Sequence, residues 1–285
     1  MEDQAYQLRN MIQKTGSQKS VRTVAVSSGK GGVGKTSITT NLGITLASMR
    51  KKVLVVDADM GLANIDIMLG IKPKYNLRHV INGEKPIDEV IVDGPCGIKI
   101  LPSASGVQSL AQLNKYQRNL LVSEFNKIQN SVDFLLIDTA AGISDNVTEF
   151  IMAAGEVIVV TTPEPTAITD AYALIKVLNR YSSSIKMNLF INMVKDANEA
   201  KEIEDNLRII TDRFLGIKVE GAGYMIKDPN VSAAIKNQVP FVLYNQKCQA
   251  SMCIKGLATK LCNYNVRETN RTLTGFLEKV TGLNK

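Results

Sequence analysis

Short apolar runs alternate with amphipathic stretches along most of the chain. The runs are rich in β-branched residues and are continuous rather than alternating, which is typical of strands buried on both faces of a parallel sheet. We expect strands at Thr23–Val26, Val53–Val56, Phe134–Ile137, Val157–Val160 and Leu189–Ile191. Helical spacing marks the stretches between them, for example Ile38–Met49 and Ala167–Tyr181. The pattern predicts an α/β fold: a doubly wound, mostly parallel sheet with helices on both faces.

The two ends of the chain differ from its centre. Residues 1–20 are polar and finish in the linker-like string GSQKS, and from about Val266 the chain continues as a separate helix. We therefore divide the 285 residues into an N-terminal helix with its linker (1–20), a central domain (21–265) and a C-terminal helix (266–285).

Composition and cysteine spacing exclude several classes of protein. No apolar run approaches the roughly 18 residues of a membrane-spanning helix, and the start Met1–Gln4 lacks the features of a secretory signal, so we expect a cytoplasmic protein. Cys96, Cys248, Cys253 and Cys262 show no C-x-x-C spacing and predict neither a zinc site nor a disulfide framework. The net charge of +7 suits an anionic partner such as a membrane surface, nucleic acid or an acidic protein, and it serves solubility equally well.

A phosphate-binding loop stands between the first predicted strand and the first predicted helix. Gly29–Thr36 fits G-x-x-x-x-G-K-[ST], in which the glycines free backbone N–H groups to face phosphate oxygens and the helix N-terminus adds positive potential. Lys35 is expected on the β- and γ-phosphates and Thr36 on Mg²⁺. The predicted nucleotide contacts are Gly29, Lys30, Gly31, Gly32, Val33, Gly34, Lys35, Thr36 and Ser37.

Lys30 is a second lysine in this loop, and it projects from the outer rim. The string KGGVGKT, Lys30–Thr36, resembles the deviant Walker A motif of the MinD/ParA family of ATPases. The resemblance implies a homodimer formed with ATP, in which Lys30 contacts the nucleotide of the partner protomer and joins Lys35 in catalysis. The alternative interpretation of Lys30 is a solvated surface cation.

Two acidic motifs accompany the loop. VVDADMGLANID supplies Asp57 and Asp59 at the carboxyl end of a strand, and FLLIDTAAG ends another strand at Asp138. An aspartate at a strand end is often only a helix cap. By resemblance to the family, Asp59 orients or activates the attacking water and Asp57 assists near Mg²⁺. Asp138 resembles the Walker B aspartate that holds a metal-bound water, and Gly142 opens a second nucleotide-sensing switch.

The expected nucleotide is ATP or ADP rather than a guanine nucleotide. Asn192 in INMV matches the family's adenine-reading asparagine, and the guanine signature N-K-x-D is absent. In GYMIKDPNV, Asp228 is expected near the base. Ile226 stands where relatives usually carry proline, which is a departure from the family's pattern at this point.

The N-terminal segment resembles a more specific family. Asp3, Gln4, Ala5, Leu8 and Arg9 match D-Q-A-x-x-L-R, the start of the FlhG (also FleN or YlxH) flagellar regulators. The resemblance implies that these residues bind the GTPase FlhF and stimulate its activity. Together with the apolar side chain of Ile12 they form a short amphipathic peptide able to lie in a partner's groove. The alternative is an ordinary helix that caps this protein's own core.

The C-terminal segment carries an apolar stripe at helical spacing. Leu273, Phe276, Leu277, Val280 and Leu283 gather on one side. The basic residues along this stripe are Arg267, Arg271, Lys279 and Lys285. This pattern predicts a helix drawn to an anionic membrane surface when ATP-driven dimerisation doubles its avidity. Docking on the body of the protein is the alternative, and both states can alternate.

These motifs predict a regulatory ATPase that controls the number and placement of flagella and that associates reversibly with the inner face of the cell membrane. By resemblance, flagellar switch-complex proteins or a flagellar transcription activator are further candidate partners. The alternatives are a MinD-type division-site regulator, which would begin almost directly at the first strand, and a ParA-type partition ATPase. We expect no nucleic-acid partner, because the C-terminal helix favours a membrane. The cysteine spacing also excludes iron–sulfur carriers of this fold.

Overall fold

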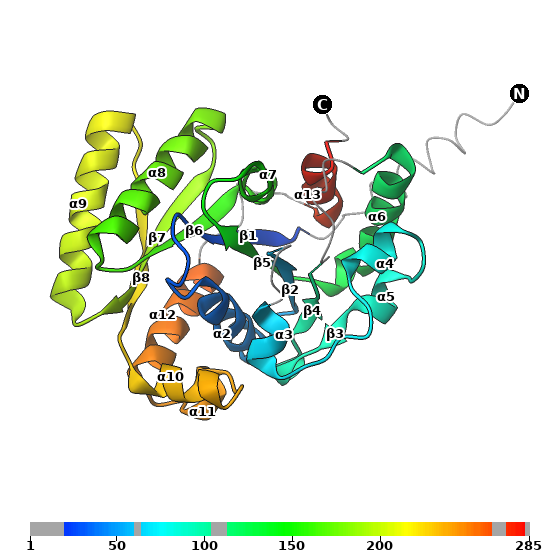
Figure 1. The fold of residues 1–285 in the computed structure, drawn as a ribbon, viewed down its shortest axis with the longest axis horizontal. Coiled ribbons are helices and arrows are strands. Elements are labelled where there is room, and N and C mark those ends of the chain that lie inside the picture. The colour runs from blue at the N-terminus through cyan, green and yellow to red at the C-terminus, as the bar shows by residue number, and fades with distance from the viewer. Residues whose placement is uncertain (1–19, 60–63, 104–112, 264–271, 283–285) are drawn as a thin grey trace, which may run out of the picture.

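A parallel sheet forms the centre of the molecule in the computed structural model, which describes residues 20–59, 64–103, 113–263 and 272–282. The described residues form an eight-stranded sheet in the order β3-β4-β2-β5-β1-β6-β7-β8 (Figure 1). The strands are β1 (Arg22–Ser28), β2 (Val53–Ala58), β3 (Val92–Asp93), β4 (Lys99–Leu101), β5 (Phe134–Ala141), β6 (Glu156–Thr161), β7 (Lys186–Val194) and β8 (Glu220–Ile226). Every pairing is parallel except that of β3 with β4.

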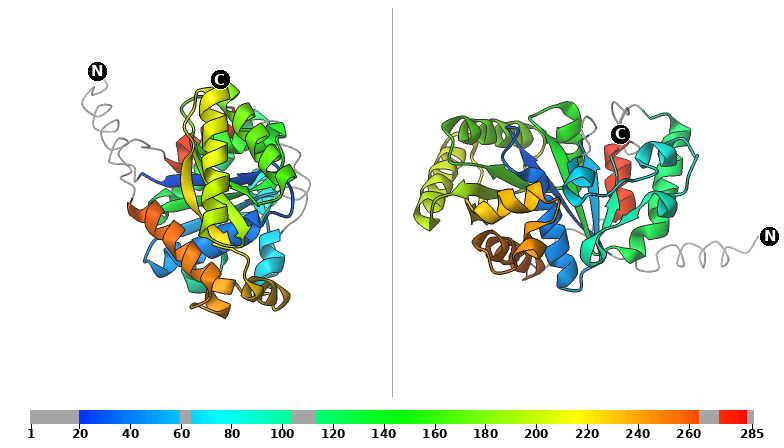
Figure 2. Two further views of the ribbon diagram at one scale, coloured as in Figure 1. Left: turned by 90° about the vertical axis from the view of Figure 1, so that its left-hand side faces the viewer. Right: turned by 60° about the horizontal axis from the view of Figure 1, so that its bottom comes forward.

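Helices cover both faces of the sheet (Figures 1 and 2). They are α2 (Lys35–Ser48), α3 (Asn64–Leu69), α4 (Leu77–Ile81), α5 (Ile87–Val90), α6 (Lys115–Ile128), α7 (Asp145–Ala154), α8 (Pro165–Tyr181), α9 (Ala197–Leu215), α10 (Pro229–Lys236), α11 (Phe241–Tyr244), α12 (Gln249–Asn263) and α13 (Leu273–Val280), with short 3₁₀ turns at Pro95–Gly97 and Gln129–Ser131. Alternate strand residues enter two separate cores: Leu54 and Val56 pack on one side with α7 and α8, and Val53 and Val55 on the other with α2 and α12. The predicted doubly wound fold is confirmed.

The five predicted strands are all present, and each extends beyond its predicted bounds. The strands β3, β4 and β8 were not predicted. The first two are only two and three residues long, and β8 contains Gly221 and Gly223, which dilute its apolar pattern. The first helix begins at Lys35, directly after the phosphate loop as the motif predicts, and includes most of the helical spacing at Ile38–Met49. The helix α8 begins at Pro165, a residue whose fixed φ favours a first helical turn.

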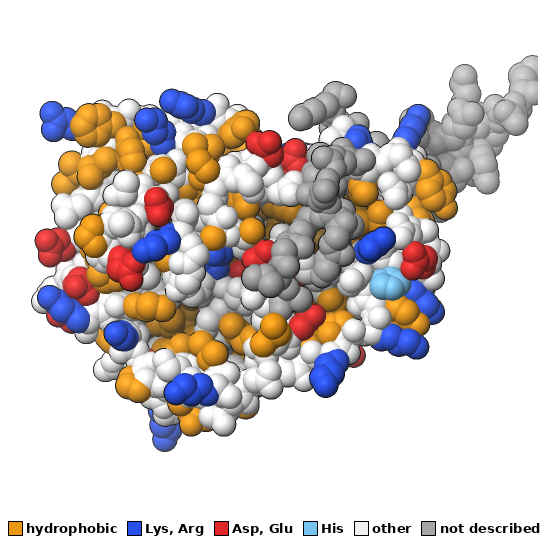
Figure 3. Space-filling view, viewed as in Figure 1, with side chains coloured by type: hydrophobic (Ala, Val, Ile, Leu, Met, Phe, Trp, Pro, Cys, Tyr) orange, Lys and Arg blue, Asp and Glu red, His pale blue; other side chains and the backbone are white. Residues whose placement is uncertain are grey.

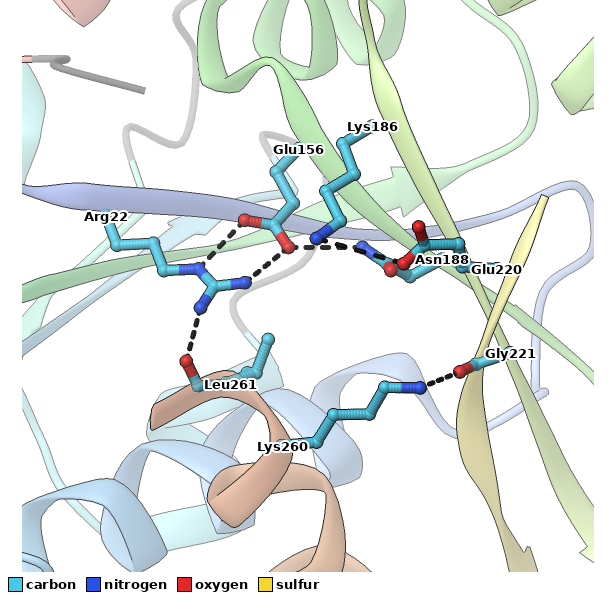
Figure 4. A network of polar contacts seen from close by, with 8 residues as sticks. All are labelled: Arg22, Glu156, Lys186, Asn188, Glu220, Gly221, Lys260 and Leu261. Carbon is cyan, nitrogen blue, oxygen red and sulfur yellow. Dashed lines mark hydrogen bonds and ion pairs between the residues drawn. The ribbon is translucent and has the colours of Figure 1, made fainter. Parts of the chain in front are cut away.

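A buried arginine joins the first strand to β6 through an ion pair and to α12 through a hydrogen bond (Figure 4). Arg22 donates from Nε and Nη2 to the two carboxylate oxygens of Glu156, at 2.9 and 2.7 Å, and from Nη1 to the carbonyl of Leu261 in α12. Asn188 donates to the same carboxylate at 3.1 Å. Because both charges are almost fully buried, removing either partner would leave an uncompensated charge in the protein interior. The entry of the chain into the sheet is thereby fixed beside the carboxyl end of α12.

The C-terminal helix α13 is docked on the protein's own core. Leu273, Phe276, Leu277 and Val280 are each at most 3% exposed, and the rings of Phe276 and Phe150 lie 6.4 Å apart. The helix is capped by Thr272, whose hydroxyl accepts the N–H of Gly275 at 3.0 Å, and it packs against α6 and α7. The apolar stripe expected to face a membrane therefore covers apolar surface of two neighbouring helices, which corresponds to the docked alternative. No helix within the described ranges is long and apolar enough to cross a membrane.

Candidate nucleotide-binding site

The phosphate loop joins β1 to α2 with the geometry that an anion requires. Gly34 has φ of 95°, and a Cβ there would lie 2.4 Å from the Asn192 side chain; a Cβ on Gly29 would lie 2.2 Å from the carbonyl oxygen of Asp170. Only glycine fits either position. The first turn of α2 has neither an acidic residue nor a side-chain cap, so its N–H groups and its positive end are open to phosphate.

Lys35 is held inside the loop that it is expected to serve. Its side chain is almost fully buried, and Nζ donates to the hydroxyl of Ser28 at 3.0 Å. Burial lowers the pKa of Lys35, while the charges of Asp138 and Asp59 act in the opposite direction. The ammonium group therefore lies at the point where α2, β5 and the end of β2 meet, as the motif predicts.

Asp57 and Asp138 lie side by side, at paired positions of β2 and β5. Both are at most 3% exposed. Burial raises the pKa of Asp57 to about 7, with the Asp138 charge adding to the rise and the N–H groups of Asp59, Ile65 and Asn64 opposing it. Burial also raises the pKa of Asp138 to about 6, although neighbouring threonine hydroxyls and the Lys35 charge lower it. Asp57 and Asp138 are therefore two buried carboxyl groups side by side. Among the described groups that shift their pKa values, Lys35 is the one cation.

The residues present fit a magnesium ion beside the phosphates. Asp138 Oδ1 accepts the hydroxyl of Thr39 at 3.3 Å, whereas Oδ2 is buried with no hydrogen-bond partner within the described ranges. Thr36 is close enough for its hydroxyl to lower the pKa of Asp138. Mg²⁺ in phosphate sites commonly takes one or two protein oxygens, with phosphate oxygens and water completing its octahedron. Thr36 and Asp138 provide such a set, directly or through water.

Asp57 has a structural task that its motif did not reveal. Its carboxylate accepts the N–H groups of Asp59, Asn64 and Ile65 at 3.0, 3.2 and 3.5 Å, and so it holds the first turn of α3. Asp59 itself is half-buried, and the hydroxyl of Ser103 donates to its carbonyl at 2.8 Å. Asp57 therefore holds the expected first switch at both of its described ends, at Asp59 on one side and at the first turn of α3 on the other.

The carboxyl pair gives a pH prediction for the nucleotide-free protein. Because both pKa values are raised in the folded state, the folded chain binds protons that the unfolded chain releases between about pH 4 and 7, so the free energy of unfolding falls across that range. Asp138→Asn is expected to remove the part of this loss that belongs to Asp138, while Asp57 stays buried, and to stabilise the protein at pH 8 by on the order of 2 kcal/mol relative to wild type. Thermal denaturation at pH 5 and pH 8 measures the effect, with the exposed Asp88→Asn as matched control. Equal pH dependence in both variants would contradict it.

Asn192 braces the phosphate loop in this structure. Its amide donates to the carbonyl of Val33 at 2.7 Å, and its Oδ1 accepts the N–H of Met193, whose φ is +60°. Asp228 caps two helices: Oδ1 accepts the N–H of Asn230 at 2.9 Å in α10, and Oδ2 accepts the N–H of Ala250 at 3.1 Å in α12. Burial would raise the pKa of Asp228, but the hydrogen bond from the Asn230 side-chain amide, together with those from the two N–H groups, lowers it overall. Asn192 therefore lies near the carboxyl end of β7, as expected, and Asp228 follows the end of β8, a strand that was not predicted; both make contacts within the protein.

Lys30 lies at the rim of the loop, as the sequence indicates, and it has partners in its own chain. Nζ donates to Glu164 Oε2 at 2.6 Å and to Thr166 Oγ1 at 2.9 Å, at the start of α8. Both charged side chains are more than a third exposed. Gly142, at the expected second switch, has φ of 96° and donates its N–H to the carbonyl of Ser28 at 2.9 Å. The loop, both switch regions and α8 therefore meet at one edge of the sheet.

The predicted FlhF-binding residues, Asp3, Gln4, Ala5, Leu8 and Arg9, lie outside the described residues. The contacts of Lys30 with Glu164 and Thr166, and the brace from Asn192 to Val33, were not found by sequence reasoning. Each joins positions more than 130 residues apart, and no local spacing encodes such a contact.

Comparison with known proteins agrees with this geometry. An AAA domain family model matches residues 21–191. The antiactivator FleN of Pseudomonas aeruginosa is 40% identical over 270 residues, which cover 94% of this chain and 96% of that protein. The chain belongs to the MinD/ParA family and is a FleN/YlxH homologue. The flagellum site-determining protein YlxH of Helicobacter pylori is 38% identical to this FleN/YlxH homologue over 65% of the chain and 62% of that protein.

Solved structures show the same architecture. The MinC:MinD cell division protein complex of Aquifex aeolicus is 28% identical, with a TM-score of 0.68 over 86% of this chain and 97% of that chain. MinD of Pyrococcus horikoshii, complexed with Mg-ADP, is 23% identical with a TM-score of 0.69 over 88% and 99%. The FleN/YlxH homologue therefore has the fold of these MinD/ParA proteins, including the mostly parallel sheet.

Proposed function

We propose that this protein is an ATP-dependent, dimerising switch that controls the number and placement of flagella. The observation that carries the proposal is the near full-length match to FleN, in a chain whose phosphate loop contains the second lysine, Lys30. Hydrolysis of ATP to ADP and phosphate would return the dimer to monomers. The protein would therefore act through its position in the cell and the partner that it binds, rather than through a reaction product.

The residues of the site have separable roles in such a cycle. Backbone N–H groups of the loop and Lys35 bind and orient the phosphates at the positive end of α2. Asp59 is half-buried beyond the end of β2, and in this proposal it would accept a proton from the attacking water. Thr36 and Asp138, with Asp57 nearby, would hold Mg²⁺, which would supply neutralisation of the phosphate charge. The brace from Asn192 to Val33 keeps the loop in its binding conformation, and Asn192 and Asp228 border the region proposed for the base.

Lys30 gives the first test of the dimer. Lys30→Ala is expected to bind ATP and to remain monomeric with it, since the lysine would no longer reach the partner's phosphates. Glu164→Gln removes the ion pair that holds Lys30 to its own chain. Because exposed ion pairs contribute at most about 1 kcal/mol each and a dimer contains two of them, ATP-dependent dimerisation is expected to strengthen by at most about 30-fold. Size-exclusion chromatography with light scattering measures both variants. An ATP-dependent dimer of Lys30→Ala would contradict this role.

Residues 1–20 give the test of the flagellar assignment. A synthetic peptide of this segment is expected to raise the GTPase rate of FlhF, and replacement of Gln4 and Leu8 by alanine is expected to abolish the stimulation. The name of the Pseudomonas relative, antiactivator, supports a transcription activator as a further partner, and switch-complex proteins are a second candidate. An inactive peptide would leave a MinD/ParA switch with a different target.

Reversible attachment to an anionic membrane surface requires α13 to leave its docking site. We propose that the ATP dimer favours the undocked helix and presents two copies of Leu273, Phe276, Leu277 and Val280 to lipid. Lys279 is exposed on α13, so Lys279→Glu changes the charge without touching the core. This variant is expected to reduce ATP-dependent pelleting with anionic liposomes severalfold, and unchanged pelleting would place the membrane contact elsewhere.

Figure 3 shows Lys and Arg interspersed with Asp and Glu over the face in view, rather than gathered in one basic stripe.

A further inference from the structure

An open groove lies beside the last strand of the sheet. It measures about 440 Å³ and runs between β8 and α12, lined by apolar side chains including Tyr224, Ile226, Met252 and Leu257. Met252 is 56% exposed although its neighbours in α12 are largely buried. Among the described strands, none pairs with the outer edge of β8. An edge strand next to an exposed apolar side chain is a surface suited to another segment of polypeptide.

The chain's own N-terminal segment enters the fold next to this groove. Arg22, two residues after the described chain begins, contacts the carbonyl of Leu261 near the carboxyl end of α12 (Figure 4). The same corner holds the start of β8, because Lys260 donates to the carbonyl of Gly221. Met252 lies nine residues before Leu261, which is about 14 Å along the helix. Residues 13–19, if extended, span roughly 23 Å, so a peptide of residues 3–12 reaches the whole groove.

Shape and charge agree with this occupant. As a helix, residues 3–12 are about 14 Å long and present Ala5, Leu8 and Ile12 on one side. A peptide that enters beside Leu261 and runs back along α12 brings its acidic start, Glu2 and Asp3, to the far end of the groove. Two exposed lysines stand there: Lys227 directly after β8 and Lys247 just before α12. The charges at the far end are therefore complementary.

We propose that residues 3–12 dock in the groove between β8 and α12 of their own chain, with the apolar side of the peptide on Met252, Tyr224 and Ile226. In the docked state Ala5 and Leu8 are covered, so the segment is withheld from a partner protein until it is released. The docking itself stands on the groove and the chain's entry point, while its regulatory consequence rests on the proposed stimulation of FlhF.

Cys253, which lines the groove, is a native probe of the docking. Leu8→Cys in the full chain, with Cys96 and Cys262 replaced by serine, is treated with diamide, which accepts the two hydrogen atoms as the thiols form a disulfide. We expect an intramolecular bond to Cys253 at least about fivefold faster than for Asn10→Cys, whose side chain points away from the apolar side. Cys253→Ser should abolish it. Equal rates at positions 8 and 10 overturn the proposal, and so do cross-links formed only between chains, which would identify a second copy as the occupant.

A second measurement follows release of the segment. Met252→Asp places a charge in the groove at an exposed position, where it does not disturb the core. Trypsin cleavage after Arg9 and stimulation of FlhF by the full chain are both expected to rise severalfold. If the free peptide stimulates FlhF but Met252→Asp changes neither rate, the docking is wrong and the proposed function stands. If the disulfide forms selectively but the peptide never stimulates, the docking stands and the proposed stimulation of FlhF is wrong.

Discussion

Replacement of Asp59 by alanine is expected to leave ATP binding intact and to slow hydrolysis by at least about 100-fold, the usual contribution of a positioned general base. The phosphate-binding elements, Lys35 and the N-terminus of α2, do not depend on this carboxylate. The backbone N–H of Asp59, which is bonded to Asp57 at 3.0 Å, survives the substitution. The variant should therefore accumulate as an ATP-bound dimer. Single-turnover hydrolysis and light scattering in the presence of ATP measure the two effects.

Asp88→Ala is the matched control for Asp59→Ala, because Asp88 is an exposed aspartate on α5. It should hydrolyse ATP at the wild-type rate. An Asp59→Ala protein that turns over ATP within about threefold of wild type would remove Asp59 from the catalytic site. A variant that fails to bind ATP would show instead that the first switch helps to form the nucleotide pocket.

Phe276→Ala is expected to lower the free energy of unfolding by about 3–5 kcal/mol, the cost of emptying a buried phenylalanine site. Phe276 is 3% exposed and packs 6.4 Å from the ring of Phe150, so α13 acts as part of the core in the undimerised chain. Urea denaturation measures the loss. Lys279→Ala, on the exposed side of the same helix, should change stability by less than about 0.5 kcal/mol.

A Phe276→Ala protein within about 1 kcal/mol of wild type would mean that α13 is already undocked in solution. Addition of anionic liposomes to the ATP-bound wild type should move α13 from its docking site on the core to the lipid surface. A helix that leaves the core loses its contacts with α6 and α7 and regains burial in lipid, so the membrane must compensate for the docking energy.

Periodicity predicted the central strands well because they are buried on both faces. Val53–Val56 and Val157–Val160 are continuous apolar runs, and both are observed. The same reasoning failed for β8, where Gly221 adds no side chain to the apolar pattern and Gly223 has φ of +141°, a conformation that favours glycine. Backbone requirements of that kind reduce the hydrophobic signal that identifies a strand.

The site was predictable where it is local in sequence. The contiguous motif Gly29–Thr36 determines the conformation of the phosphate loop by itself. The aspartates at strand ends reach the same edge of the sheet because parallel strands all end there. The stabilising contacts were not predictable, since the Asn192 amide and Glu164 meet the loop only after the sheet has formed. The apolar stripe of α13 was visible, but its spacing is the same for a lipid surface as for a neighbouring helix.

The contact between Arg22 and Leu261 brings the start of β1 to within one hydrogen bond of the carboxyl end of α12. The two ends of residues 21–263 consequently lie close together. The segment before Ser20 and the segment after Asn263 are therefore attached to the body of the protein at neighbouring points. A fluorophore placed before Ser20 and another after Asn263 would begin close together, whatever their segments do farther out. Tension on the N-terminal segment would act directly on the buried guanidinium of Arg22, and tension on the C-terminal segment would reach the same guanidinium once α13 has left its docking site. A protein that pulls on an undocked C-terminal segment therefore also loads the attachment point of the N-terminal one.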